Sequence, residues 1–187
     1  MQFYHILVNK EHRLGREDCP ADLEEAMICF APETEPGKRL LRKEAARNLK
    51  EMFQRAEEEG LYLAGVSGYR SYERQEEIYQ NSLLTKGKAH TEKYIAPPGG
   101  SEHQTGLAMD VSCQEMDYEL EEEFEQTEAG IWIQKNASLF GFILRYPKGR
   151  ENITGYAYEP WHIRYVTKDL AFYLTKMNLT LEEYWAY

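Results

Sequence analysis

The stretch SEHQTGLAMDVS, residues 101–112, joins a histidine and a carboxylate through a bend. Its last part, LAMDVS (107–112), has the apolar composition of a short strand, and Gly106 in front of it permits a tight turn. A carboxylate in such a strand is costly to bury unless it is paired or bound to a metal. We therefore expect Asp110, at the end of this strand, and His103, in the preceding loop, to point toward one shared ion.

The segments before this strand predict a helix, a strand and a second helix. Over residues 38–59, apolar side chains recur at three- and four-residue steps, and Gly60 follows as a stop signal. LYLAGVSG (61–68) predicts a short buried strand, and a polar helix follows over residues 71–84. Residues 87–100 contain PPGG and predict a loop.

The segments after this strand continue the mixture of helices and strands. Three of them have clear apolar patterns, namely residues 131–142 as a helix and residues 142–146 and 161–166 as strands. Gly141 stops the helix, and KGRENITG (148–155) is a turn region between the strands. Two helices follow at the C-terminus, where Thr180 and Glu183 predict a capping box for the last one.

This irregular order of elements, without repeated βα units, predicts the fold class. We expect an α+β fold in which a mainly antiparallel sheet is flanked by helices. No repeat or low-complexity linker divides the chain. Residues 1–187 are therefore expected to form a single domain, on which residues 1–36 pack as an N-terminal arm.

Composition and charge exclude several classes of function. The net charge of −10 argues against a broad nucleic-acid-binding surface and provides no polybasic membrane anchor. The three cysteines lack CxxC spacing, so no disulfide framework or cysteine zinc site is indicated. The N-terminus lacks the features of a signal peptide, which favours a cytoplasmic protein, with an extracytoplasmic location as the alternative if the chain is trimmed. Oligomeric state leaves no signature in the sequence.

Two short motifs together predict a hydrolytic metal site. Catalytic zinc usually takes three His, Asp or Glu ligands and leaves one position for water. EPWH places Glu159 three residues before His162, where a carboxylate can sit beside the metal as a general base. His162 can thus join His103 and Asp110, although each histidine taken singly is more often a hydrogen-bonded surface residue.

Other charged residues allow both an ordinary and a functional interpretation. His5, His12 and His90 are interpreted as surface or hydrogen-bonded residues. Arg70 alone would form a surface ion pair, but in a cleft it would bind a substrate carboxylate or stabilise an oxyanion. The eight acidic residues between Glu115 and Glu128 form a solvated face or a lid over the cleft.

With these residues in view, the chain resembles the zinc D-Ala-D-Ala peptidases of the VanY, VanX and bifunctional VanXY type, relatives of the L,D-carboxypeptidases and of the hedgehog zinc domain. The matching pieces include VSGYRSYERQ, GGSEHQTGLAMDVS, GFILRYP and ITGYAYEPWHIRYV, and they run in family order across nearly the whole chain. The combination of SxHxxGxAxD with ExWH is far more specific than either motif alone.

The resemblance implies a hedgehog-like D,D-peptidase fold and a set of site residues. It implies Zn²⁺ ligation by His103, Asp110 and His162, with Glu159 as general acid and base. It also implies that four residues contact or wall in the substrate, namely Arg70, Ser101, Gln75 and Trp161. The implied substrates are small peptides ending in D-Ala: the D-Ala-D-Ala dipeptide, the pentapeptide precursor of peptidoglycan, or both, whose cleavage removes the target of vancomycin.

Two alternatives stay open at this point. One is an L,D- or D,D-carboxypeptidase that acts on the cell wall and whose anchor has been removed. The other is a noncatalytic, zinc-stabilised peptide-binding module, against which the presence of Glu159 beside a complete ligand set argues. The sequence does not distinguish dipeptide, pentapeptide and L,D-tetrapeptide substrates, nor D-lactate and D-serine termini.

Overall fold

The computed structural model describes residues 4–186, so residues 1–3 and 187, at the ends of the predicted domain and arm, lie outside the described residues. Its centre is an antiparallel sheet of four strands in the order β3-β4-β6-β5. These strands are β3 (Leu63–Ser67), β4 (Ala108–Cys113), β5 (Phe142–Tyr146) and β6 (Glu159–Tyr165). A second, antiparallel sheet pairs β1 (Leu23–Glu25) with β2 (Leu40–Arg42). The predicted α+β class with an antiparallel sheet is confirmed.

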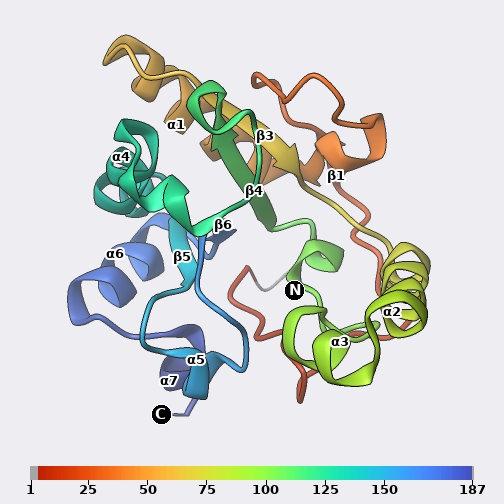
Figure 1. Ribbon diagram of the computed structural model, residues 1–187. Helices are drawn as coiled ribbons and strands as arrows, with labels where there is room; N and C mark the ends of the chain where they lie inside the picture. The colour runs from red at the N-terminus through yellow and green to blue at the C-terminus, as the bar shows by residue number, and fades with distance from the viewer. Residues whose placement is uncertain (1–3, 187) are drawn as a thin grey trace.

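Helices surround the larger sheet (Figure 1). They are α1 (Lys43–Glu58), α2 (Tyr72–Lys86), α3 (Lys88–Tyr94), α4 (Glu128–Asn136), α5 (Glu151–Thr154), α6 (Lys168–Met177) and α7 (Leu181–Trp185). Short 3-10 turns are η1 (Pro36–Arg39), η2 (Glu102–Thr105), η3 (Gln114–Met116), η4 (Glu122–Gln126) and η5 (Ala137–Phe140). None of the helices within residues 4–186 has both the length and the hydropathy needed to cross a membrane.

The central strands have one apolar and one polar face. Met109 of β4 and Ile163 of β6 are fully buried in one core cluster with Leu49 of α1 and Ile133 of α4. Because successive side chains of a strand point to opposite faces, the neighbours of Met109 and Ile163 face the other way. That second face carries Asp110 and the polar residues of β6, and it forms the floor of the site.

Several predicted elements have the expected bounds or signals. β5 spans the predicted residues 142–146. Gly60 and Gly141 follow a helix with φ of +83° and +87°, as expected of glycine stop signals. The capping box of Thr180 and Glu183 at the start of α7 is confirmed.

Other predictions about local structure were wrong. The helix expected from residue 38 begins at Lys43, because residues 40–42 instead pair with β1 and Arg42 binds Asp22 through Nε and Oδ1 at 2.9 Å. The predicted loop 87–100 contains α3, and the predicted turn 148–155 contains α5. Asp110 lies inside β4 rather than at its end, opposite a residue on each neighbouring strand.

Gly68, which follows β3, brings this strand end against η1 and β2. Its N–H donates to the carbonyl of Lys38 at 2.6 Å, and the next N–H, of Tyr69, donates to the carbonyl of Leu40. A Cβ at position 68 would lie 2.6 Å from the Leu40 oxygen and 2.8 Å from the Lys38 oxygen. Since both obstacles are backbone atoms, a side chain at this position would push the strand end away from β2.

We therefore expect Gly68→Ala to destabilise the protein by about 1–3 kcal/mol, the usual cost of overpacking. The matched control is Gly37→Ala, because no atom lies within 4 Å of a Cβ at position 37. Thermal unfolding of both variants measures the difference, at roughly 2–4 °C per kcal/mol for a chain of this size. Equal melting temperatures for the two variants would contradict the close approach at Gly68.

Candidate metal centre and active site

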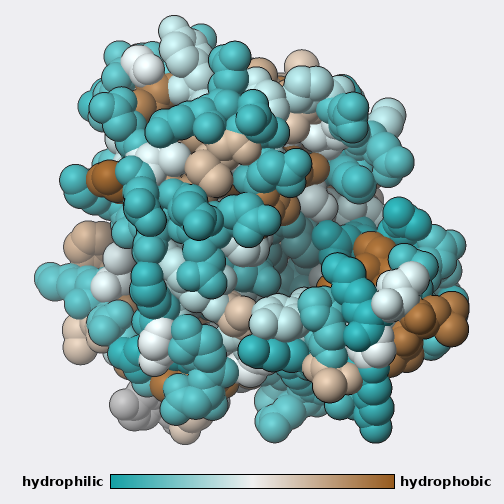
Figure 2. Space-filling view, viewed as in Figure 1, coloured by the Kyte–Doolittle hydropathy of each residue, from teal (hydrophilic) through white to brown (hydrophobic). Residues whose placement is uncertain are grey.

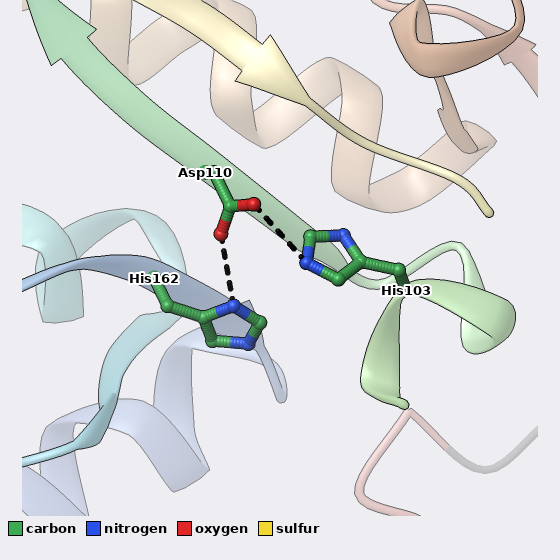
Figure 3. Close-up of side chains that lie close together, drawn as sticks. All are labelled: His103, Asp110 and His162. Atoms are coloured by element: carbon green, nitrogen blue, oxygen red, sulfur yellow. Dashed lines mark hydrogen bonds and ion pairs between the residues drawn. The ribbon is translucent and has the colours of Figure 1, made fainter. Parts of the chain in front are cut away.

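Three side chains from different elements meet on the polar face of the sheet. His103 comes from η2, Asp110 from β4 and His162 from β6, and both imidazole rings point at the Asp110 carboxylate (Figure 3). Nε2 of His103 lies 3.2 Å from Oδ2 of Asp110, and Nδ1 of His162 lies 3.0 Å from Oδ1. All three side chains are at most 7% exposed. The sequence motifs thus converge on one point.

The backbone explains this convergence. Asp110 and His162 are direct partners in the antiparallel register of β4 and β6, and opposite residues in such a ladder have Cβ atoms about 4.5–5.5 Å apart. His103 reaches the same point because Gly106, with φ of +64°, ends η2 and turns the chain into β4. The bend predicted at Gly106 is therefore the feature that adds the third side chain.

Burial and mutual interaction set the charges of the three groups. Burial raises the pKa of the Asp110 carboxyl, but His103 and His162 outweigh it and hold that pKa well below its usual range. Burial lowers the pKa of His103, against the attraction of Asp110. For His162, burial also lowers the pKa, but hydrogen bonds to Asp110 and Glu102 raise it to about 9. At neutral pH the Asp110 anion therefore lies beside a protonated His162, whose proton a bound metal would have to displace.

The donor atoms of this group suit a divalent metal. They lie within 4.8 Å of one another, with two imidazole nitrogens and one carboxylate oxygen. Nδ1 of His103 donates to the carbonyl of Gly68 at 2.7 Å, which leaves the lone pair of Nε2 facing Asp110. Two His and one carboxylate form a known ligand set of catalytic zinc, and a carbonyl that fixes the second ring nitrogen is the usual outer partner.

Glu159 stands beside this group without belonging to it. Its Oε2 lies 3.8 Å from Nδ1 of His162, and its side chain is 24% exposed. Burial raises the pKa of the Glu159 carboxyl to about 7, although the nearby His162 works in the opposite direction. A carboxyl with that pKa can accept and return a proton at neutral pH, which is what the predicted general base must do.

A pocket opens above these residues. Figure 2 shows a hollow in this face of the molecule, between its main body and the α2–α3 pair. The pocket walls contain every site residue predicted from the sequence: Arg70, Gln75, Ser101, His103, Asp110, Glu159, Trp161 and His162. Ile78 of α2 and Tyr94 of α3 contribute to the wall on the side of that helix pair, and Ala96 and Glu102 also line the cavity. The structure therefore brings all the predicted residues to one cavity.

Arg70 is held in this pocket by its neighbours. Its Nη1 donates to Oε1 of Gln75 at 2.9 Å and its Nη2 to Oγ of Ser67 at 3.3 Å. Burial lowers the pKa of the Arg70 guanidinium, which Asp110 and Glu159 oppose. Nε2 of Gln75 in turn donates to the carbonyl of Ala96 at 2.7 Å. Each polar atom of Gln75 thus makes one hydrogen bond, which fixes the orientation of the amide beside Arg70.

The structure also shows site residues that the motifs missed. Glu102, buried next to His103, places its Oε2 3.3 Å from Nε2 of His162. Behind it lie Arg145 and Arg164, both fully buried. A signal for the two arginines was present, since each interrupts an apolar strand and a buried charge needs a partner as much as Asp110 does.

The acidic segment 115–128 stands apart from the pocket. Of the described residues that line the cavity, none belongs to this segment. Phe124 anchors it with a fully buried ring, and Glu125 accepts hydrogen bonds from Lys148 and from the hydroxyl of Tyr158, both at 2.8 Å. These contacts tie the segment to the body of the protein and do not place it over the cavity as a lid.

Comparison with known proteins agrees with this arrangement. A sequence model of the family described as VanY, D-alanyl-D-alanine carboxypeptidase, matches residues 38–168. The protein YodJ of Bacillus subtilis (strain 168) is 51% identical over 178 residues, which cover 95% of this chain and 65% of YodJ. The chain thus spans less than two thirds of that relative.

Two solved structures illustrate the similarity in fold. The LD-carboxypeptidase LdcB superposes with a TM-score of 0.93 at 50% identity, over 96% of this chain and 84% of that one. A variant of the vancomycin resistance D,D-pentapeptidase VanY, solved in complex with Zn(II), superposes with a TM-score of 0.79 at 30% identity, over 97% of this chain and 98% of that one.

The geometry predicts that metal binding stabilises the folded chain. With Zn²⁺ at a hundredfold excess over its Kd, the free energy of unfolding should rise by about 2.7 kcal/mol, because the ion binds the folded state. Asp110→Asn should abolish this gain, since it replaces the central carboxylate with an amide. Asp169→Asn, an exposed position in α6, is the control and should keep the gain. Equal stabilisation of both variants by Zn²⁺ would place the ion elsewhere.

Proposed function

The chain belongs to the VanY family of D-alanyl-D-alanine carboxypeptidases, and we propose that it is a zinc peptidase that removes the C-terminal D-alanine from stem peptides of peptidoglycan. One observation carries the proposal. A metal ligand set, a carboxyl with a pKa of about 7 and the partly buried Arg70 line the same pocket. Hydrolysis of a peptide next to its terminal carboxylate needs these three groups together.

His103, Asp110 and His162 are proposed to hold the zinc ion. When bound, zinc supplies a Lewis acid that lowers the pKa of water and polarises a carbonyl group. The three side chains leave one side of the group open to the pocket, since all of them also line it. Such an open position separates a catalytic site from a structural one.

Glu159 is proposed as the general base and then the general acid. With a pKa of about 7, it can take a proton from the attacking water and return it to the leaving amine. Its partial exposure on the pocket wall allows both transfers without a change of fold. A noncatalytic binding module would have no use for such a group.

Arg70 is proposed to bind the terminal carboxylate of the peptide or the developing oxyanion. Its guanidinium lies in the pocket, where low exposure strengthens a charge-assisted hydrogen bond. Gln75 and Ser67 fix its orientation through Nη1 and Nη2. Ser101 and Trp161 are proposed as further contacts, because each side chain belongs to the same wall.

The L,D bond of a tetrapeptide is the proposed point of cleavage. Support comes from the likeness to the LD-carboxypeptidase LdcB, whose 50% identity and TM-score of 0.93 exceed the 30% and 0.79 for the VanY D,D-pentapeptidase. Cleavage of D-Ala-D-Ala termini is the second candidate, which the match of residues 38–168 to the VanY family favours.

Release of D-alanine from three substrates tests this proposal. The zinc-loaded protein should release it from a tetrapeptide ending in an L,D bond, and more slowly from free D-Ala-D-Ala and from a pentapeptide ending in D-Ala-D-Ala. A preference for the latter two substrates would establish the D,D-peptidase function instead. Binding of the peptides without any release would support a binding module.

Replacement of the base separates chemistry from metal binding. We expect Glu159→Gln to retain a full equivalent of zinc while kcat falls by roughly 10²- to 10⁴-fold, the usual contribution of general acid–base catalysis. His103→Ala should lose both zinc and activity. Metal content by atomic absorption, measured beside kcat, checks the difference. Loss of zinc from Glu159→Gln would mean that Glu159 is a ligand.

A further inference from the structure

Beside His162 lies a cluster of buried charges, of which Glu102 also borders the pocket. Oε1 of Glu102 accepts a hydrogen bond from Nε of Arg145 at 2.7 Å and one from Nη1 of Arg164 at 2.6 Å. These three side chains are 0% exposed. Arg145 also binds both oxygens of Glu182, in α7, at 2.9 and 2.6 Å. Two cations and two anions thus balance within the fold.

The hydrogen bonds of Glu102 determine that Nε2 of the His162 ring carries a proton. The arginines occupy Oε1, and Oε2 faces Nε2 of His162 at 3.3 Å. A carboxylate only accepts, so Nε2 must carry a proton to make this bond. Asp110 likewise takes a proton on Nδ1 at 3.0 Å, and a bound metal would replace this second proton and meet the lone pair of Nδ1. Glu102 therefore selects the tautomer that can bind a metal on the pocket side.

Both ends of the chain hold this cluster in place. Nη2 of Arg164 donates to the carbonyls of Tyr4 and Ile6 at 3.0 and 2.8 Å. In α7, near the C-terminus, Glu182 also accepts a hydrogen bond from Nδ2 of Asn9 at 3.1 Å. The N-terminal arm thus binds Arg164 and α7 binds Arg145, while each arginine reaches Glu102 through a different nitrogen.

We propose that Glu102 is a positioning residue of the metal centre, which orients His162 and keeps the lone pair of its Nδ1 directed at the ion. The inference rests on the proposed zinc site but not on peptidase activity. The competing explanation is a purely structural ion-pair cluster, in which loss of one partner would destabilise the fold without a direct effect on the metal centre. The two explanations differ in what they predict for zinc affinity in the folded protein.

Glu102→Gln distinguishes them, because arginines only donate hydrogen bonds. The amide oxygen must turn toward Arg145 and Arg164, so the amide N–H₂ faces Nε2 of His162. Nε2 must then accept a hydrogen bond instead of donating one. The ring proton therefore moves to Nδ1, and the lone pair of Nδ1 is no longer available to the metal. Loss of such an outer partner usually costs 10- to 100-fold in metal affinity. We expect a weakening of Zn²⁺ binding in this range.

Glu182→Gln is the matched control. It makes the same chemical change within the same cluster, and Glu182 also binds Arg145, but its contacts stop short of His162. We expect this variant to lose thermal stability while its Kd for Zn²⁺ stays within about threefold of the parent value. If the cluster were purely structural, the two variants would have the same Kd for Zn²⁺ after this Kd is corrected for the fraction of folded protein.

The Kd for Zn²⁺ is measured by competition with a chromophoric chelator, using folded protein of each variant. Side-chain ¹⁵N NMR of the zinc-loaded parent gives a second readout that needs no variant to fold. It should show zinc on Nδ1 of His162 and a proton on Nε2. A proton on Nδ1, or equal zinc affinity of the two glutamine variants, would overturn the proposal. Because neither readout uses a peptide, absence of peptidase activity would leave this inference standing and refute only the proposed function.

Discussion

The pairing of Asp110 with His162 across β4 and β6 is the constraint on which the site depends. In an antiparallel sheet, the register decides which side chains face each other, and a slip of either strand by one residue would turn its own side chain, Asp110 or His162, to the opposite face. That face is the core, where Met109 and Ile163 pack against α1 and α4. The hydrophobic effect that buries Met109 and Ile163 therefore also fixes Asp110 and His162, two of the proposed metal ligands, in register.

The polar face of the sheet is stable because its charges are arranged in complementary sets. Asp110 lies between two imidazoles, and Glu102 lies between two arginines. A buried charge without a partner would cost several kcal/mol, whereas each of these groups has at least two. The resulting network also couples the site to remote parts of the chain, since Arg164 binds the N-terminal arm and Arg145 binds α7. Preorganisation of the ligands is thus a property of the whole fold.

Sequence patterns predicted the elements that bury an apolar face and the residues that act together in a motif. β5, the glycine stops and the group of His103, Asp110 and His162 followed from local signals. The start of α1 could not be predicted from local signals. Leu40 and Leu41 continue the helical spacing, but they pair with β1, which lies in the N-terminal arm. The role of Glu102 could not be predicted either, since it depends on two arginines that lie 43 and 62 residues further along the chain. Local chemistry can be predicted from spacing, whereas a network of buried charges needs the tertiary structure.

Catalytic groups and pocket wall come from separate parts of the fold. The proposed metal ligands and Glu159 lie on η2 and on the sheet, whereas Ile78 and Tyr94 belong to the α2–α3 pair on the other side of the hollow. Because of this separation, substitutions in the wall would leave the register of β4 and β6, and with it the proposed ligand set, unchanged. Gln75 limits that freedom, since it bonds both Arg70 and the carbonyl of Ala96. A change of the wall at Ala96 would therefore act through Gln75 on Arg70, the residue proposed to bind the terminal carboxylate.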